Sequence, residues 1–262
     1  MFFTLQSWEL ALVILTVIGT ATAVGYGVGL YLRKHQEKLR EPFGVLQAAL
    51  LGVVGLILAF GLSLAVGRYE DRRAATVDEA NAIGTSYLRA QLLAEPDRTK
   101  TLALFPRYTD LAIQISKEIP GSAGMRHTTA REGVLQRQLW QLAGQSIAAA
   151  PNASAPRLYV DSLNATFDAQ STRVSALNNR VPSAVLTLEV IGAAIAMGLL
   201  ALHISVLGRG LVAMLAAAGL VTLLLLVTFD LDRPTRGLIK VPDTPLVAVR
   251  ASMALPPAAG SS

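Results

Sequence analysis

The stretch FGVLQAALLGVVGLILAFGLSLAV, Phe43–Val66, is followed directly by the polar sequence GRYEDRRAATVDEANA, Gly67–Ala82. The apolar part is long enough to cross about 30 Å of hydrocarbon as an α-helix, which rises about 1.5 Å per residue. Neither glycine nor proline interrupts the junction that follows Gly67. The sequence therefore predicts one long helix that leaves the membrane and continues in water to about Ala94, where Glu95-Pro96 stops it.

Three further apolar runs reach the length of a membrane span: 8–32, 185–206 and 211–229. None of the four runs alternates with a period of two residues, so helices are favoured over the strands of a barrel. The charged loop Arg33–Pro42 joins the first two runs, and the short turn Leu207–Gly210 joins the last two. The sequence therefore predicts two transmembrane helical hairpins.

The segment between the hairpins is polar and is expected to lie outside the membrane. Helices are predicted at Asp97–Glu118, Thr129–Ala150 and Arg157–Asn179, from apolar spacing and from turn-forming residues between them. The predicted fold class is all-α, a polytopic membrane protein whose two hairpins flank a helical extramembrane domain. The expected boundaries are 1–66 for hairpin 1, 67–182 for the helical domain, 183–230 for hairpin 2, and 231–262 for a membrane-exit motif and flexible tail.

Composition argues for a membrane protein and against an enzyme. The 262 residues are 52% hydrophobic and 16% charged, with a mean hydropathy of +0.47, and soluble domains carry about 25% charge. The absence of cysteine excludes disulfides and thiolate metal sites, and the three histidines are not spaced for a metal. We therefore expect no catalytic residue, metal or cofactor. The glycines of Gly25–Gly29 lie inside a span, where they favour helix packing over phosphate binding.

The net charge of +5 is best explained by basic residues that flank the spans, so no nucleic-acid partner is expected. More of these flanking residues lie on the face that holds the helical domain than on the opposite face. By the positive-inside rule this distribution favours a cytoplasmic domain, although the first loop is the densest in positive charge.

Small side chains recur along one face of the second span. At about 100° per residue they form a single stripe: Gly44, Ala48, Gly52, Gly55, Ala59 and Ser63. Such a stripe lets another helix approach closely, which favours helix association in lipid. Two interpretations stay open, namely packing within one subunit and contact between copies of this helix around a shared axis.

In the second interpretation, a bulky face of the same helix forms a hydrophobic constriction. The candidate pore-lining residues are Leu51, Leu58 and Leu62. Past the membrane exit, Arg68 and Arg72 would form charged rings that favour anions. The simpler alternative is that these charges stabilise an exposed helix or bind lipid headgroups.

Charged residues at the membrane exits are candidates for structural ion pairs: Asp71 and Arg73 in the long helix, and Asp232 and Arg233 after the last span. We expect Asp232 to pair with Arg72 or Arg73, which would join the hairpins to the helical domain. Glu189, inside the third span, is expected to reach water at the interface.

Two motifs resemble those of the bacterial bestrophin-like domain family. The first is RYEDRR, Arg68–Arg73, followed by DEANAIGTSYLR, Asp78–Arg89; the second is LDRPTRGLI, Leu231–Ile239. The resemblance covers residues 43–246 in matching order. The name of the family implies a remote likeness to bestrophins, which are pentameric anion channels with four membrane helices and a helical cytoplasmic domain.

This resemblance implies a homo-oligomer, a pentamer, in the bilayer of a bacterial inner membrane, with the second span lining a pore. The acidic cluster by which animal bestrophins bind calcium is not recognisable here, nor is their aromatic neck pattern, so calcium gating is not carried over. The functional hypothesis is passive conduction of a small anion. The alternative is a non-conducting membrane scaffold or sensor whose helical domain binds a soluble partner.

Overall fold

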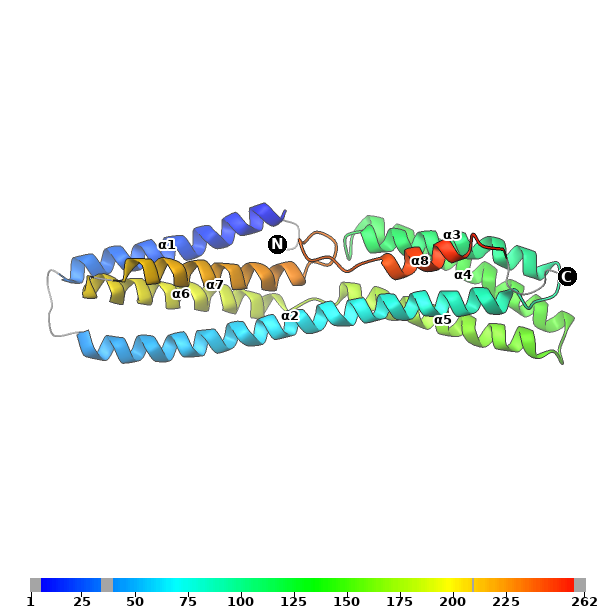
Figure 1. Ribbon diagram of the computed structural model, residues 1–262, viewed down its shortest axis with the longest axis horizontal. Coiled ribbons are helices and arrows are strands. Elements are labelled where there is room, and N and C mark those ends of the chain that lie inside the picture. The colour runs from blue at the N-terminus through cyan, green and yellow to red at the C-terminus, as the bar shows by residue number, and fades with distance from the viewer. Residues whose placement is uncertain (1–5, 34–39, 209, 257–262) are drawn as a thin grey trace. The chain divides into compact units, whose positions relative to one another are not determined.

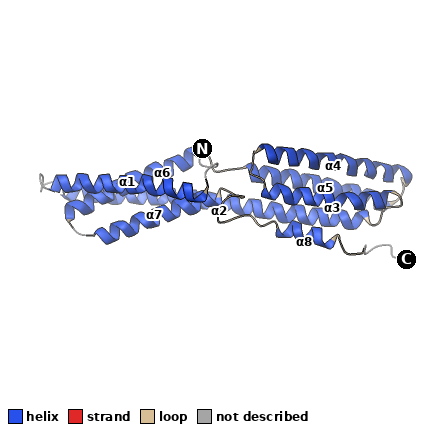
Figure 2. Ribbon diagram, turned by 90° about the horizontal axis from the view of Figure 1, so that it is seen from above, coloured by secondary structure: helices blue, strands red, loops and turns tan. Residues whose placement is uncertain are grey.

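The computed structural model describes residues 6–33, 40–208 and 210–256. Helices account for most of these residues (Figures 1 and 2), and their bounds are α1 Ser7–Arg33, α2 Arg40–Ala90, α3 Asp97–Lys117, α4 Ala123–Ala149, α5 Ser154–Asn178, α6 Ser183–Leu207, α7 Leu211–Leu231 and α8 Thr244–Ser252. No strand occurs within the described ranges. The predicted all-α class is confirmed.

Four helical segments are long and apolar enough to cross a membrane: Ser7–Arg33, Gln47–Ala90, Ser154–Leu207 and Leu211–Leu231. The apolar part of the third segment is α6. The chain is a multi-pass membrane protein, and its spans come in the predicted order. Most of the expected loop between the first two spans, residues 34–39, lies outside the described residues.

The chain divides into two compact units. The membrane unit comprises residues 1–69 and 180–240, and the extramembrane unit comprises residues 70–179 and 241–262. Helix α2 belongs to both, because it is continuous from Arg40 to Ala90 and the division falls between Tyr69 and Glu70. A continuous helix was predicted here because neither glycine nor proline follows Gly67 at the junction.

The membrane unit is built around α6, which packs against α1 and α7 (Figure 1). Its buried core draws on α1, α2, α6 and α7. Gly208 and Gly210 have positive φ angles of 73° and 98°, which glycine adopts without steric cost. This backbone conformation allows the short connection from α6 to α7.

The extramembrane unit is a helical bundle in which α4 packs against both α3 and α5. Its main core includes Ile83 of α2, Phe105 of α3, Leu139 of α4 and Tyr159 of α5, all fully buried. Tyr87 and Phe105 meet edge to face with ring centroids 5.9 Å apart. Each of these helices therefore buries the face on which its apolar residues recur.

Two element boundaries differ most from those expected. Helix α2 ends at Ala90 instead of about Ala94, because the next residues form tight turns before Pro96. Helix α4 begins at Ala123 instead of Thr129, since the hydroxyl of Ser122 accepts a 3.0 Å hydrogen bond from the backbone N–H of Met125.

The expected flexible tail contains a helix. Helix α8 packs against α3, and the side chain of Leu246 in α8 is fully buried. The Tyr87 hydroxyl donates to the carbonyl of Met253, just after α8, and the Arg250 Nε donates to Asp110 at 2.8 Å. These contacts order residues that composition alone assigned to a tail.

Candidate functional site

One face of the membrane-spanning half of α2 packs into the core of its own membrane unit. Val54, Leu58 and Ala65 are buried there, and Leu58 is only 5% exposed. Leu51 and Leu62 are half-buried and pack against the same core. This placement argues against a role for Leu58 in lining a pore, because its side chain is already enclosed by its own chain.

The opposite face of α2 is open. A Cβ atom built at Gly52 or Gly55 meets no atom within 4 Å, and Ala59 and Ser63 are exposed. Ala48 of the same stripe is exposed too, whereas Gly44 lies against the imidazole of His203. Among the described residues of one subunit, most of the small-residue stripe is therefore exposed.

Bulky apolar side chains accompany the open stripe. Leu56 is 56% exposed, Phe60 67% and Leu64 37%. Their spacing of four residues aligns them along one side of α2. We refer to Leu56, Phe60 and Leu64 as the open apolar row. The sequence alone did not single out this row, because its residues are as hydrophobic as Leu51 and Leu58 and differ from them only in burial.

Glu189 of α6 is fully buried against α2. A Cβ atom at Gly61 would overlap its carboxyl oxygen Oε1, so only glycine leaves room for this side chain. Neither carboxyl oxygen of Glu189 has a hydrogen-bond partner among the described residues. The expectation that Glu189 reaches water is therefore wrong within the single subunit.

The glycine run of α1 packs helix against helix, as expected. A Cβ atom at Gly25 would overlap the carbonyl oxygen of Gly198 in α6, and one at Gly29 would overlap the backbone of Leu202. The hydroxyl of Ser205 donates to the carbonyl of Tyr26 at 2.8 Å. Close backbone approach of this kind is a main source of helix association in lipid.

The charged residues at the point where α2 leaves the membrane differ in burial and in their partners. Arg68 is half-buried, and its Nε atom has no hydrogen-bond partner in the described part of the chain. Asp71 is exposed, and Arg73 forms an exposed pair with Glu70 at 3.5 Å. The predicted pairing of Asp232 with Arg72 or Arg73 stays a prediction.

Arg72 is fully buried instead of facing solvent. Its Nη2 donates to the carbonyl of Asn179 at 2.7 Å, and its Nε donates to the carbonyl of Ala176 at 3.3 Å. These carbonyls lie at the C-terminal end of α5, where backbone acceptors lack partners within the helix. Arg72 therefore caps α5, which argues against its predicted place in a solvent-facing ring.

The second family-like motif forms a loop that folds back onto α7. Both carboxyl oxygens of Asp230 accept backbone hydrogen bonds, from Leu238 at 2.9 Å and Ile239 at 2.7 Å. A Cβ atom at Gly237 would lie 2.8 Å from the Asp230 carboxyl group, so the motif requires glycine there. Asp232 accepts from the backbone N–H of Val181 at 3.1 Å, and Arg233 is buried.

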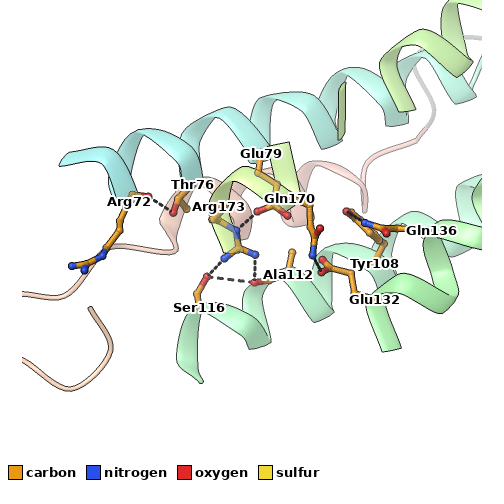
Figure 3. A network of polar contacts seen from close by, with 10 residues as sticks. All are labelled: Arg72, Thr76, Glu79, Tyr108, Ala112, Ser116, Glu132, Gln136, Gln170 and Arg173. Carbon is orange, nitrogen blue, oxygen red and sulfur yellow. Dashed lines mark hydrogen bonds and ion pairs between the residues drawn. The ribbon is translucent and has the colours of Figure 1, made fainter. Parts of the chain in front are cut away.

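A buried polar cluster lies within the extramembrane unit (Figure 3). Glu79 of α2 forms an ion pair with Arg173 of α5, and both side chains are fully buried. The other two guanidinium nitrogens of Arg173 donate to the Ser116 hydroxyl at 2.9 Å and to the Ala112 carbonyl at 3.0 Å. Arg173 thus joins α2, α3 and α5.

A second carboxyl group, Glu132 of α4, lies in the same cluster (Figure 3). Its Oε2 accepts a 2.6 Å hydrogen bond from the Gln170 amide, and its Oε1 has no partner among the described residues. Burial, and then the charge of Glu79, raise the pKa of Glu132 to about 8, against the opposing effects of Arg173 and Gln170.

Sequence reasoning missed the Glu79–Arg173–Glu132 cluster. The available signal was position: Glu132 shares a helical face with Leu135 and Leu139, both of which are buried. A charge inside an apolar stripe predicts a buried polar contact, although the partner on another helix is not visible in the sequence. No group of three or more metal-ligating side chains occurs in the part of the chain that the structure describes.

Comparison with known proteins places these features in context. A family model described as Bestrophin-like domain matches residues 10–246. Among curated proteins, none matches the chain.

Solved structures of a bacterial bestrophin homologue from Klebsiella pneumoniae are similar to the chain. A variant with isoleucine replaced by threonine has a TM-score of 0.68 at 13% identity, with 92% of this chain and 97% of that chain covered. A variant with tryptophan replaced by alanine has a TM-score of 0.67 at 14% identity, with 94% of each chain covered. At this identity the likeness establishes a shared fold.

Proposed function

Because this chain belongs to the bestrophin-like family, we propose that it is an oligomeric channel that conducts small anions passively across a bacterial inner membrane. The observation that carries the proposal is the open face of α2. A membrane helix that runs on into a polar domain, and most of whose small-residue stripe is exposed in its own subunit, is suited to meet its copies. The likeness to bestrophins supports a pentamer with its helical domain in the cytoplasm.

The open apolar row is the proposed constriction of the pore. Leu56, Phe60 and Leu64 are exposed in the subunit, so an axis beside the open face would bring their copies together. A narrow ring of apolar side chains blocks ions by excluding water. This assignment replaces Leu51, Leu58 and Leu62 as pore-lining candidates, since that set packs against the subunit's own core.

Arg68 is the remaining candidate for a charged ring. It lies one turn beyond Leu64, and its Nε atom has no hydrogen-bond partner among the described residues. A ring of guanidinium groups at the end of an apolar constriction favours anions over cations. Conduction needs no covalent chemistry, only weak and repeated binding along the pore.

Ion flux from liposomes tests the proposal. Purified protein in chloride-loaded liposomes is expected to release chloride, and Phe60→Ala is expected to raise the rate by widening the constriction. Arg68→Gln is expected to shift selectivity away from anions. Leu223→Ala in α7, also at an exposed apolar position, is the matched control and should leave the flux unchanged.

Two outcomes would contradict the proposal. The absence of flux for several anions and cations would contradict channel activity. Flux that responds equally to Phe60→Ala and Leu223→Ala would contradict the assignment of the open apolar row to the pore.

A further inference from the structure

The extramembrane unit contains two buried carboxyl groups and one buried guanidinium group. Glu79, Glu132 and Arg173 are each fully shielded from solvent, and all belong to the cluster in Figure 3. If both carboxyl groups were ionised, the cluster would hold one negative charge in excess. A buried charge without a partner is strongly unfavourable, so such a group tends to become neutral.

The contacts of Arg173 show which carboxyl group it neutralises. Its Nε forms the ion pair with Glu79, while the other two guanidinium nitrogens donate to Ser116 and the Ala112 carbonyl. Every guanidinium nitrogen thus has a partner other than Glu132. Arg173 is therefore the counter-charge of Glu79: burial raises the pKa of the Glu79 carboxyl group, and the guanidinium of Arg173 opposes that rise.

Glu132 has much weaker compensation. Its one hydrogen bond comes from the uncharged Gln170 amide, and its Oε1 is without a partner in the described residues. The other polar groups around it are the Tyr108 hydroxyl, which accepts from Gln136 at 3.4 Å, and the Glu79–Arg173 pair. The titratable and charged groups facing Glu132 are thus Glu79 from α2, Tyr108 from α3 and Arg173 from α5.

We infer that Glu132 is a proton-binding site: the folded extramembrane unit holds its carboxyl group protonated at neutral pH, and release of this proton sets a second carboxylate against the Glu79–Arg173 pair. That pair ties the polar half of α2 to α5, so loss of the proton weakens the contact between these helices. The site is independent of ion conduction. It makes the stability of the unit depend on pH in the neutral range, where an ordinary glutamate stays ionised and does not titrate.

The sign of the pH dependence follows from linkage. An unfolded glutamate titrates near its ordinary pKa of 4.5, and burial raises the pKa of Glu132 in the folded unit to about 8. The stabilisation is fully present below the unfolded pKa and is lost as the pH rises toward the folded value. Between these limits the folding equilibrium constant falls about tenfold per pH unit because of this one group.

Thermal unfolding of the full chain in detergent micelles, from pH 5 to pH 9, tests the inference. Glu132→Gln keeps the size and hydrogen-bonding capacity of the side chain but cannot ionise. The wild-type protein is expected to lose stability relative to Glu132→Gln as the pH rises, with the difference levelling off near pH 8. Asp168→Asn, an exposed change in α5, is expected to follow the wild-type curve. Parallel curves for wild type and Glu132→Gln would overturn the inference.

Infrared spectroscopy tests the protonation state directly and does not depend on the folding of Glu132→Gln. The wild-type protein is expected to show the carbonyl stretch of a protonated carboxylic acid at pH 7, and this band should disappear above pH 9. In Gln170→Leu the band is expected to move to higher frequency, because its hydrogen-bond donor is gone. Absence of the band at pH 7, or a band indifferent to Gln170→Leu, would overturn the assignment to Glu132.

Discussion

At the level of single residues, two arginines of the extramembrane unit, Arg72 of α2 and Arg173 of α5, are buried. Arg72 caps the end of α5 through backbone carbonyls, and Arg173 joins α2, α3 and α5 through Glu79, Ser116 and Ala112. Guanidinium groups suit such places because five donors in a fixed plane can satisfy several acceptors at once. The polar half of α2 is therefore held by directed contacts as well as by its apolar face.

Removing Arg173 is expected to destabilise the protein severely. Arg173→Met leaves the Glu79 carboxylate buried without its cation, and breaking a buried pair in this way costs about 3–5 kcal/mol. The midpoint of thermal unfolding in detergent measures the loss.

A double variant and a surface control sharpen this test. Glu79→Leu combined with Arg173→Met is expected to recover much of the loss, because no unpaired charge remains. Arg89→Ala breaks a surface pair with Asp161 and one hydrogen bond to the Leu158 carbonyl, and it is expected to cost about 1 kcal/mol, well below the loss for Arg173→Met. Equal losses of stability for Arg173→Met and Arg89→Ala would show that the buried pair contributes no more to stability than the surface contacts.

At the scale of helices, close packing in the membrane unit depends on glycine. Gly25 and Gly29 of α1 lie against the α6 backbone, and Gly61 of α2 makes room for Glu189. In each case a single methyl group would collide with a neighbouring atom. At other glycines, among them Gly19, Gly52 and Gly55, an added methyl group would meet no described atom within 4 Å.

Gly25→Ala and Gly19→Ala form a matched pair of substitutions within α1. Gly25→Ala is expected to lower stability by about 1–3 kcal/mol, because the added methyl group forces α1 away from α6. Gly19→Ala meets no described atom and is expected to leave stability unchanged or to raise it by up to about 1 kcal/mol through helix propensity. Thermal unfolding in the same detergent compares them, and a larger loss for Gly19→Ala would contradict the described α1–α6 packing.

The helices themselves were largely predictable from sequence, whereas their partners were not. Long apolar runs indicated the spans, and the lack of glycine and proline just after Gly67 indicated the extended α2. The start of α4 was misjudged because the Ser122 cap was overlooked, and α8 was missed because its one fully buried residue, Leu246, sits in a Pro- and Ala-rich stretch. Local patterns report helix formation, but which face of a helix meets which neighbour is decided by tertiary packing.

The candidate site shows the same division. The small-residue stripe of α2 was visible from spacing alone, but the sequence could not show which bulky residues lie beside its open part. Leu58 and Phe60 are both apolar and two positions apart, yet the first is 5% exposed and the second 67%. Likewise, no pattern in the sequence joined Glu132 to Glu79, because these residues lie on different helices and meet only in the folded unit.

At the level of the whole molecule, a pore forms only if the open face of α2 meets its copies. Gly52, Gly55, Ala59 and Ser63 contact little in the subunit, and the open apolar row lies beside them. A subunit that leaves this surface to lipid would be a four-span protein without a pore. A ring of subunits would place the same residues around a central path.

The most direct measurement is the symmetry of the purified protein, imaged by electron cryomicroscopy in lipid nanodiscs at a resolution that traces α2. We expect a five-fold ring in which the copies of α2 surround the axis and Phe60 points toward it. A monomer, or an assembly in which the open face of α2 contacts only lipid, would contradict a pore lined by α2.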